Sequence, residues 1–386
     1  MSQIISWIHF GDLHISGPDE QNYRDFLSLI AEANRHMSVG VQFALLPGDN
    51  ADDGEEDEYQ LVREAISRCR FPVHAIAGDH DVAAGSLHLF RQYLSPAPYR
   101  SFTVGEYHFL LLNGVATWQP PVFGLGSEQI AWLRNEMLRN ELSREGFPCR
   151  SVVFMHAYPS EHGDDAAQLR ELFRNNGVLM IEMGHTHYNE LANDGHIIYA
   201  TTRSTGQIEE GPAGFSVTTL DNGVVSWKFK PIGEWPLVMV TWPADQRLVT
   251  DAMGPAQIFH HQVQVRARVW GPAIETVSLS IDGGGETSMS PLGESTWSGI
   301  WNTQDHADGL HRLTVTARTE DNRSASDTIL VQVNTTGIYE SCNRRPVDYE
   351  NTLGAWPEKH ILGTQLGPNE NGHPWPPSRE RARALR

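Results

Sequence analysis

The sequence predicts a layered α/β domain, then an all-β domain, then an extended tail. Three observations support this: apolar strands alternate with amphipathic helices in the first part, strictly alternating strands without helices follow, and the last part is rich in Pro, Gly and Asn. A chain of 386 residues has room for two or three domains. We expect these at 1–232, 245–335 and 336–386, with a linker at Pro231–Pro243.

The first domain is predicted from two kinds of periodicity. Short, almost continuous apolar runs indicate strands buried on both faces, and we expect them at 4–10, 43–46, 73–77, 108–112, 151–155 and 178–183. Apolar residues recur at helical spacing between them, over 22–37, 58–69, 127–140 and 166–175. The pair Asn222-Gly223 lies between two alternating runs, which predicts a hairpin that closes the domain.

The second domain is predicted to be a small β-sandwich of immunoglobulin-like type, without the Cys pair of antibody domains. Trp297 and Trp301 occupy alternate positions of one strand, and we expect them in its core rather than on an exposed sugar-binding face. The tail holds aromatic residues that disordered segments normally lack, so we expect Trp356 and Trp375 to pack on the body of the protein and to shape the rim of the site.

Composition excludes several classes of function. A net charge of −19 disfavours a long nucleic acid as ligand, because the chain repels polyanions. No apolar run is long enough to span a membrane, and the first residues lack a signal-peptide pattern, so we expect a cytoplasmic protein that does not bind membranes. Cys69, Cys149 and Cys342 lack metal-type spacing and are expected to be reduced thiols. A homo-oligomer is compatible with this composition.

Carboxylate and imidazole side chains follow the predicted strands one after another. Two residues apart on an extended chain, side chains point the same way, so Asp-x-His and His-x-His can each present two ligands to one ion. Neighbouring glycines allow the backbone to turn sharply there. The residues are Asp12, His14, Asp49, Asp79, His80, His156, His185 and His187. One such motif alone is more often a solvated loop, but the whole series predicts a metal site.

The ligand types indicate which metals fit. Mixed carboxylate and imidazole donors suit Mn, Fe, Zn or Co better than Ca or Mg, and we favour Mn or Fe. Two such ions about 3.5–4 Å apart, bridged by a carboxylate, form the arrangement used for in-line displacement at phosphorus.

The motif series resembles a known family. Asp12-x-His14, Gly48-Asp49, Gly78-Asp79-His80-Asp81, His156 and Gly184-His185-x-His187 are similar to the motifs of the calcineurin-like metallophosphoesterases, and most of all to the class III cyclic nucleotide phosphodiesterases. The resemblance covers about 6–229 and implies a metallophosphoesterase sandwich fold. It implies hydrolysis of a small phosphodiester, such as a 3′,5′-cyclic nucleotide, by a hydroxide that bridges two metals.

The resemblance also implies a role for each site residue. Asp12, His14, Asp49 and His187 would hold the first metal, with Asp49 bridging to the second. Asp79, His156 and His185 would complete the second metal site. His80 would stabilise the transition-state charge or protonate the leaving oxygen, and Asp81 would orient the His80 imidazole.

One position departs from the family pattern, which usually has Asn where this chain has Asp79. The extra negative charge should bind the second metal more tightly and repel a phosphate dianion more than a diester monoanion. We therefore expect a preference for diesters over monoesters. The alternative is that Asp79 is protonated, or hydrogen-bonded and off the metal.

Other interpretations remain open at this stage. A phosphomonoesterase or nucleotidase would use the same scaffold, and an inactive metal-binding scaffold protein would keep the fold without turnover. We expect the other polar candidates to have structural roles. Asn50, Asp52 and Asp53 would cap the following helix or face solvent in a loop, and Asn113 would form a turn. The histidines without metal-type spacing are expected to pack or to face solvent; they are His108, His196, His260 and His261.

Overall fold

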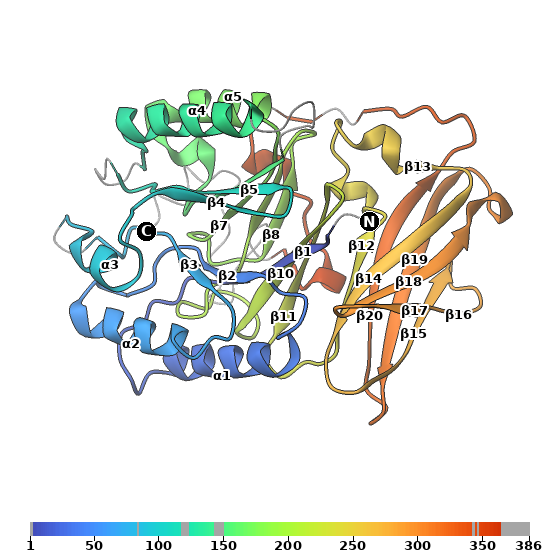
Figure 1. Cartoon of the computed structure of the whole chain (residues 1–386), viewed down its shortest axis with the longest axis horizontal. Helices are drawn as coiled ribbons and strands as arrows, with labels where there is room; N and C mark the ends of the chain where they lie inside the picture. The colour runs from blue at the N-terminus through green and yellow to red at the C-terminus, as the bar shows by residue number, and fades with distance from the viewer. Residues whose placement is uncertain are drawn as a thin grey trace.

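The computed structural model describes residues 3–82, 85–116, 123–142, 150–341, 344–345 and 347–363. Figure 1 shows two β-sheets in the N-terminal part, with helices on their outer faces and a further pair of sheets beside them. This layered α/β arrangement agrees with the predicted fold class for the first part of the chain. No helix among these residues is both long and apolar enough to cross a membrane.

The first sheet is five-stranded and mixed. Its order is β11 (Val224–Pro231), β10 (Gly214–Asp221), β1 (Ile5–Phe10), β2 (Phe43–Leu46) and β3 (Val73–Ala75). Strands β1, β2 and β3 are parallel, so their carboxyl ends meet at one edge. Strands β10 and β11 form the antiparallel hairpin predicted at Asn222-Gly223, where Asn222 has φ 51° and Gly223 φ 87°.

The second sheet is six-stranded. Its order is β4 (Arg100–Val104), β5 (Tyr107–Leu111), β6 (Ser151–Phe154), β7 (Val178–Met183), β9 (Ile198–Thr201) and β8 (Glu190–Asn193). Strands β5, β6, β7 and β9 are parallel, whereas β4 and β8 pair antiparallel at the two edges. The edge strands β4 and β8, and strand β9, were not predicted from the sequence.

Helices cover the outer face of each sheet. They are α1 (Gln21–His36), α2 (Glu56–Ile66), α3 (His88–Tyr93), α4 (Gly126–Leu142) and α5 (Ala166–Asn175). One core lies between the first sheet and α1 and α2, a second lies between the two sheets, and a third lies between the second sheet and α4 and α5. Helix α2 begins with a reciprocal capping box between Glu55 and Glu58, which satisfies backbone donors of its first turn.

Two further sheets share a separate core. One contains β12 (Leu237–Trp242), β14 (Gln262–Trp270), β18 (Thr296–Asn302) and β17 (Ser290–Gly293); the other contains β13 (Ile258–Phe259), β20 (Ser324–Val333), β19 (Gly309–Thr319), β15 (Ile274–Ile281) and β16 (Thr287–Ser288). Trp297 and Trp301 pack in this core, as predicted. The immunoglobulin-like type of this sandwich stays a prediction.

The predicted linker at Pro231–Pro243 was wrong over most of its length. Residues Leu237–Trp242 form β12, which pairs with β14 and contributes Val238 and Val240 to the sandwich core. Pro and Trp at the ends of this run suggested a linker, but the apolar residues between them alternate and are buried by a partner strand that is distant in sequence.

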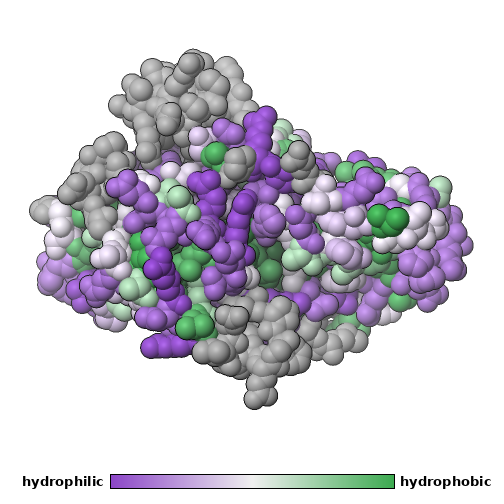
Figure 2. Space-filling view, turned by 90° about the horizontal axis from the view of Figure 1, so that it is seen from above, coloured by the Kyte–Doolittle hydropathy of each residue, from purple (hydrophilic) through white to green (hydrophobic). Residues whose placement is uncertain are grey.

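Short 3₁₀ helices occur in the connections and in the C-terminal segment. They are η1 (Pro159–Glu161), η2 (Gly163–Asp165), η3 (Gln246–Leu248), η4 (Gly254–Gln257), η5 (Thr303–Asp305), η6 (Tyr349–Asn351) and η7 (Pro357–Lys359). Trp356 is buried in the core between the first two sheets, whereas Trp375 lies outside the described residues. Figure 2 looks down on the α4 and α5 side, where the described surface is mostly hydrophilic and its hydrophobic residues are scattered.

Candidate metal centre

Each predicted ligand lies just beyond the carboxyl end of a strand. Asp12 and His14 follow β1, Asp49 follows β2, and Asp79 follows β3. In the second sheet, His156 follows β6, and His185 and His187 follow β7. Because these strands are parallel within each sheet and the sheets pack face to face, the loops meet at one edge of the sandwich. This shared edge brings together residues that lie up to 175 positions apart.

Four of the seven predicted ligands have left-handed backbone conformations. Their φ angles are 45° at His14, 50° at Asp49, 65° at His185 and 62° at His187. Such conformations are uncommon for residues with a Cβ and cost on the order of 1–3 kcal/mol each. They persist only where the surrounding structure imposes them, and they concentrate at functional sites. The strained backbone turns each side chain toward the common edge.

The first ligand group consists of Asp12, His14, Asp49 and His187, all buried. Each offers one nitrogen or carboxylate oxygen, and these atoms all lie within 4.8 Å of one another. Nε2 of His14 is 3.2 Å from Nε2 of His187 and 3.7 Å from Oδ2 of Asp49. Two imidazole nitrogens at this separation share a small volume with two carboxylates, as the ligands of one metal ion do.

The second ligand group consists of Asp79, His156 and His185. Oδ1 of Asp79 is 3.1 Å from Nε2 of His156 and 3.4 Å from Nδ1 of His185. Oδ2 of Asp49 is 3.3 Å from Nε2 of His156, so this carboxylate contacts both groups. Nδ1 of His156 donates to the Pro47 carbonyl at 2.9 Å, which leaves Nε2 as the ligand atom.

Glycines leave the space that these side chains occupy. A Cβ on Gly184 would clash with Oδ1 of Asp12, and a Cβ on Gly48 would clash with Nδ1 of His156. Gly48 also has φ 111°, which side chains rarely adopt. Larger residues at these two positions would displace a ligand from each group.

The electrostatics of the site favour a bound cation. Burial, together with the neighbouring Asp49 carboxylate, raises the pKa of Asp12 well above its usual value. Burial lowers the pKa of His156, but contacts with Asp49 and Asp79 outweigh this and raise it well above its usual value. Oδ1 of Asp12 is buried and has no hydrogen-bond partner among the described residues. Carboxylates that are buried together with imidazoles and an unpartnered oxygen fit transition-metal ligation.

His80 lies beside both groups and is held by a residue that sequence reasoning assigned to the loop. Nδ1 of His80 donates to the backbone carbonyl of Asp52 at 2.5 Å, and Oδ1 of Asp52 is 3.1 Å from Nδ1 of His14. Burial lowers the pKa of His80, but Asp49 and the other nearby carboxylates outweigh this effect and raise it. The sequence offered one indication that Asp52 lies at the site, since it comes only three residues after the predicted ligand Asp49.

The structure gives the Asp81 carboxylate hydrogen-bond partners other than the His80 imidazole, so its predicted role in orienting that ring stays a prediction. The carboxylate of Asp81 accepts hydrogen bonds from Nδ2 of Asn50 (2.8 Å), Oη of Tyr59 (2.9 Å) and N of Gly78 (2.9 Å), and none of its described hydrogen bonds reaches the His80 imidazole. Burial and the nearby Asp49 charge raise the pKa of Asp81 to about 6. Asp81 points into the protein because these donors, together with N of Asn50 and N of Ala51, satisfy its carboxylate, and it ties the Asp49 loop to the Asp79 loop.

Two further residues near the site could not be found by spacing. Nε2 of Gln207 is 3.2 Å from Nδ1 of His14, although the two residues are 193 positions apart. The ring of Phe123 packs edge-on against His185, with ring centres 4.9 Å apart. Only the fold brings either residue to the ligands.

The other polar residues considered from the sequence have structural roles. Oδ1 of Asn113 accepts from N of Val115, as in a turn, and Nε2 of His108 is 3.3 Å from Oε1 of Glu136. His196 is exposed, and the rings of His260 and His261 contact each other at a tilt of 50°. These positions agree with the packing, turn and surface roles predicted for them.

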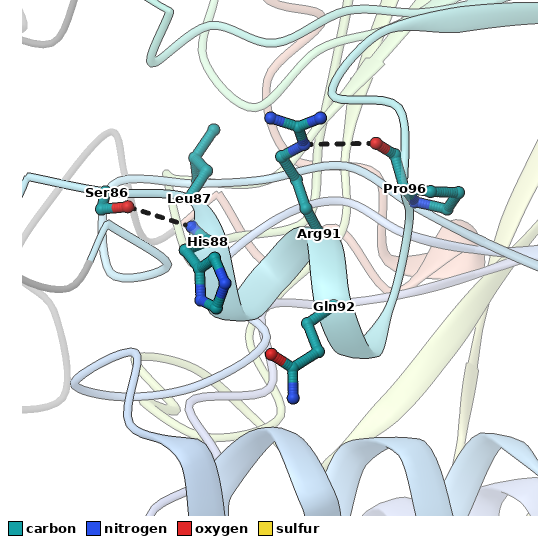
Figure 3. Close-up of a pocket in the computed structure, with 6 residues that line it drawn as sticks. All are labelled: Ser86, Leu87, His88, Arg91, Gln92 and Pro96. Atoms are coloured by element: carbon teal, nitrogen blue, oxygen red, sulfur yellow. Dashed lines mark hydrogen bonds between the residues drawn. The ribbon is translucent and has the colours of Figure 1, made fainter.

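A pocket of about 700 Å³ lies at α3 and contains none of the predicted ligands. It is lined by Ser86, Leu87, His88, Arg91, Gln92 and Pro96. Figure 3 shows that the side chains of Arg91 and His88 point away from each other rather than toward a common centre. The candidate functional site is therefore formed by the two ligand groups and not by this pocket.

Comparisons with known proteins agree with this geometry. The profile described as calcineurin-like phosphoesterase matches residues 6–189. A curated relative, named a probable cyclic nucleotide phosphodiesterase of Moraxella catarrhalis (strain BBH18), is 26% identical over 174 residues, which are 41% of this chain. The match spans 58% of that relative's length. A dimetal phosphatase from Danio rerio shares the fold, with a TM-score of 0.50 at 13% identity over 60% of this chain and 97% of that chain.

Proposed function

We propose, from the calcineurin-like phosphoesterase domain that this chain contains, that the protein is a metal-dependent phosphodiesterase acting on a small diester such as a 3′,5′-cyclic nucleotide. The observation that carries the proposal is the contact of Asp49 with both ligand groups, 3.7 Å from His14 and 3.3 Å from His156. A carboxylate in this position suits a bridge between two ions. The name of the Moraxella catarrhalis relative supports the substrate class.

The proposed ligands divide as the two groups do. Asp12, His14 and His187 would hold the first ion, Asp79, His156 and His185 would hold the second, and Asp49 would contact both. Mn, Fe, Zn and Co all suit this donor set, and Mn or Fe is our first choice. When bound, the two ions would supply Lewis acidity and lower the pKa of a water molecule, so that hydroxide is available near neutral pH.

We propose that His80 contacts the substrate and acts on it directly. Its Nδ1 proton is held by the Asp52 carbonyl, so Nε2 is the atom that can carry a proton to the leaving oxygen. In the metal-free site, the carboxylates of Asp49, Asp79 and Asp52 outweigh burial and raise the pKa of His80 above its usual value. A protonated imidazole also stabilises the negative charge that develops on the phosphoryl oxygens in the transition state.

The charge of the site supports a diester rather than a monoester. Asp12, Asp49 and Asp79 offset three of the four positive charges that two divalent ions bring. Each negative charge in the site lowers the attraction for a monoester dianion about twice as much as for a diester monoanion, because the interaction scales with the charge of the substrate. Asp79 is the residue that decides this balance, because Asn at this position would leave one more positive charge.

One preparation can test the proposal with two measurements. Elemental analysis should find about two transition-metal ions per chain, and a generic aryl phosphodiester should be hydrolysed faster than its monoester. Chelation should abolish turnover, and Mn or Fe should restore it. A faster monoester would indicate a phosphomonoesterase, two ions without any turnover would indicate an inactive scaffold, and no bound metal would refute the assignment.

A further inference from the structure

The C-terminal segment 347–363, which we call the C-terminal clasp, is built into the phosphoesterase part of the chain. Trp356 and Ile361 are buried in the core between the two N-terminal sheets. N of Leu353 donates to the Leu191 carbonyl at 2.8 Å, beside β8. The guanidinium carbon of Arg247 is 3.3 Å from the centre of the Trp356 ring. These contacts fix the path of the clasp across the second sheet.

Near its C-terminal end, the clasp places a backbone carbonyl against two residues that lie close to the first ligand group in the chain. His360 follows η7 with φ 60°, and its carbonyl accepts from Nδ2 of Asn189 (2.9 Å) and Nη2 of Arg203 (2.8 Å). Arg203 is only 1% exposed, and its guanidinium also donates to the carbonyls of Glu210 and Pro212. A buried guanidinium needs each of these acceptors, so the His360 carbonyl helps to fix its position.

Arg203 leads directly into the segment that supports the first ligand group. N of Arg203 donates to Oδ1 of Asn189 at 2.9 Å, two residues after His187. The next residue, Ser204, donates from N to the His187 carbonyl (3.3 Å) and from Oγ to the Asp12 carbonyl (2.9 Å). The backbones of Asp12 and His187 therefore rest on residues that the His360 carbonyl holds.

A buried ion cluster fixes the clasp from the other side. Nζ of Lys359 is 2.8 and 3.0 Å from the two carboxylate oxygens of Asp327 on β20, and Nζ of Lys228 on β11 is 3.5 Å from Oδ1 of the same residue. The three side chains are almost fully buried. The residue before His360 is thus tied to the β-sandwich, so the position of the His360 carbonyl depends on the assembled chain.

We propose that His360 is a positioning residue whose backbone carbonyl, through Asn189 and Arg203, holds residues 203–206 in the geometry that gives the first ligand group its metal affinity. This inference rests on the proposed metal-dependent function. The C-terminal clasp would then support metal binding by the first ligand group, in addition to packing against the two N-terminal sheets. Loss of the carbonyl should weaken one of the two metal sites and leave the other nearly unchanged.

A pair of substitutions at one position tests the proposal in the full-length chain. His360→Pro cannot adopt φ near 60° and must move the carbonyl, whereas His360→Gly adopts it freely and removes only the imidazole. Titration of the metal-free proteins with Mn²⁺, followed by calorimetry and electron paramagnetic resonance, should show one site weakened tenfold or more in H360P. H360G should bind both ions like the unsubstituted protein.

Amide hydrogen exchange gives a readout that does not require metal. Exchange at 203–206 in the metal-free protein should be faster in H360P than in H360G. A stability control is Leu313→Ala in the sandwich core, which should lower Tm without changing Mn²⁺ affinity or this exchange. If H360P does not fold, Lys359→Met removes the ionic anchor without altering His360 and should change both quantities in the same direction.

The possible failures are distinguishable. Equal Mn²⁺ affinities in H360P and H360G, with equal exchange at 203–206, would overturn the role of His360 even if Tm falls. Absence of Mn²⁺ binding in the unsubstituted protein would instead overturn the proposed function, and the exchange comparison would still decide whether the clasp holds this segment.

Discussion

Oδ2 of Asp49 lies 3.3 Å from Nε2 of His156, so a carboxylate of the first ligand group contacts a histidine of the second. Asp49 itself is 1% exposed and has φ 50°. Burial raises its pKa, but the contact with His156 and its neighbours outweighs this and lowers it to about 2. The carboxylate is therefore ionised throughout the physiological range. One side chain thus joins the two groups, and its replacement should disturb both.

Asp49→Asn should remove metal from both groups. The amide has nearly the same shape but lacks the charge, so the two ions would lose the anion that lies between them. Metal content should fall from about two to less than one per chain, and diester turnover should fall at least 100-fold, since even groups that only orient ligands are worth 10–100-fold. Elemental analysis and initial rates measure both. Asp53→Asn on the same loop, where the side chain is exposed, should leave metal content unchanged.

Asp79→Asn should shift selectivity toward monoesters. The substitution removes one negative charge beside His156 and His185, so a dianionic substrate would meet less repulsion. We expect the ratio of monoester to diester kcat/KM to rise by roughly tenfold, which corresponds to about 1.4 kcal/mol. Metal analysis should show weaker retention at one site. Unchanged selectivity with unchanged metal content would mean that the Asp79 charge has no influence.

His80→Ala should strongly reduce turnover without emptying the site. Proton transfer and charge stabilisation by a positioned imidazole contribute roughly 10²–10⁴-fold, and we expect a loss of kcat in this range with about two metals retained. His88→Ala is the matched control, because His88 is an exposed histidine eight residues away at the α3 pocket. Full activity in the His80 variant would refute the assignment.

The stability of the protein should decrease in mild acid because of His162. Complete burial holds the pKa of His162 at about 4, below its ordinary value of 6.5, while Nδ1 donates to the Tyr158 carbonyl at 3.0 Å. Between these values the unfolded chain takes up a proton that the folded protein excludes, so stability falls as pH is lowered from 6.5 to 4, by up to about 3 kcal/mol. Above pH 6.5 both states are neutral and His162 adds no pH dependence.

Urea unfolding at several pH values can isolate this contribution. The difference in unfolding free energy between the unsubstituted protein and His162→Asn should shrink as pH falls through this window, because the variant has no imidazole to protonate. Other groups titrate equally in both proteins and cancel in the difference. Parallel curves would contradict the prediction.

Asp327→Ala should be strongly destabilising. It would leave the ammonium groups of Lys228 and Lys359 buried without their shared carboxylate, and breaking a buried ion pair in this way costs about 3–5 kcal/mol. Denaturant unfolding measures the loss. Glu64→Ala breaks an exposed pair with Arg68 on the surface of α2 and should change stability by no more than about 0.5 kcal/mol.

Local patterns predicted most elements of the first domain because their signal is strong there. Strands such as β1 and β7 are apolar throughout, and α1 presents Phe26, Leu29 and Ala33 on one buried face. Strand β12 was missed because its flanking Pro and Trp residues are typical of a linker. Strands β8 and β9 are short, and their pairing with distant partners determines them more than their own composition does.

The candidate ligand residues could be named in advance because Asp and His recur just after the ends of the strands. The hydrogen-bond partners of those residues could not be predicted from the sequence. Asp52 carries its carboxylate toward His14, whereas Asp81 turns its own inward to Asn50 and Tyr59, although both follow similar Gly-Asp motifs. Which way a short acidic side chain points depends on donors that come from other segments, and spacing along the chain does not record them.

The sequence by itself determined the parallel α/β core, the alternating strands of the second domain and the set of candidate metal-ligand residues, because hydrophobic periodicity and side-chain chemistry are local properties. The tertiary structure decided which carboxylate joins the two groups, that Asp52 rather than Asp81 contacts His80, and that the C-terminal clasp reaches Arg203. These relationships arise from backbone strain, burial and hydrogen bonds between residues distant in sequence, and such contacts exist only once the sheets have packed.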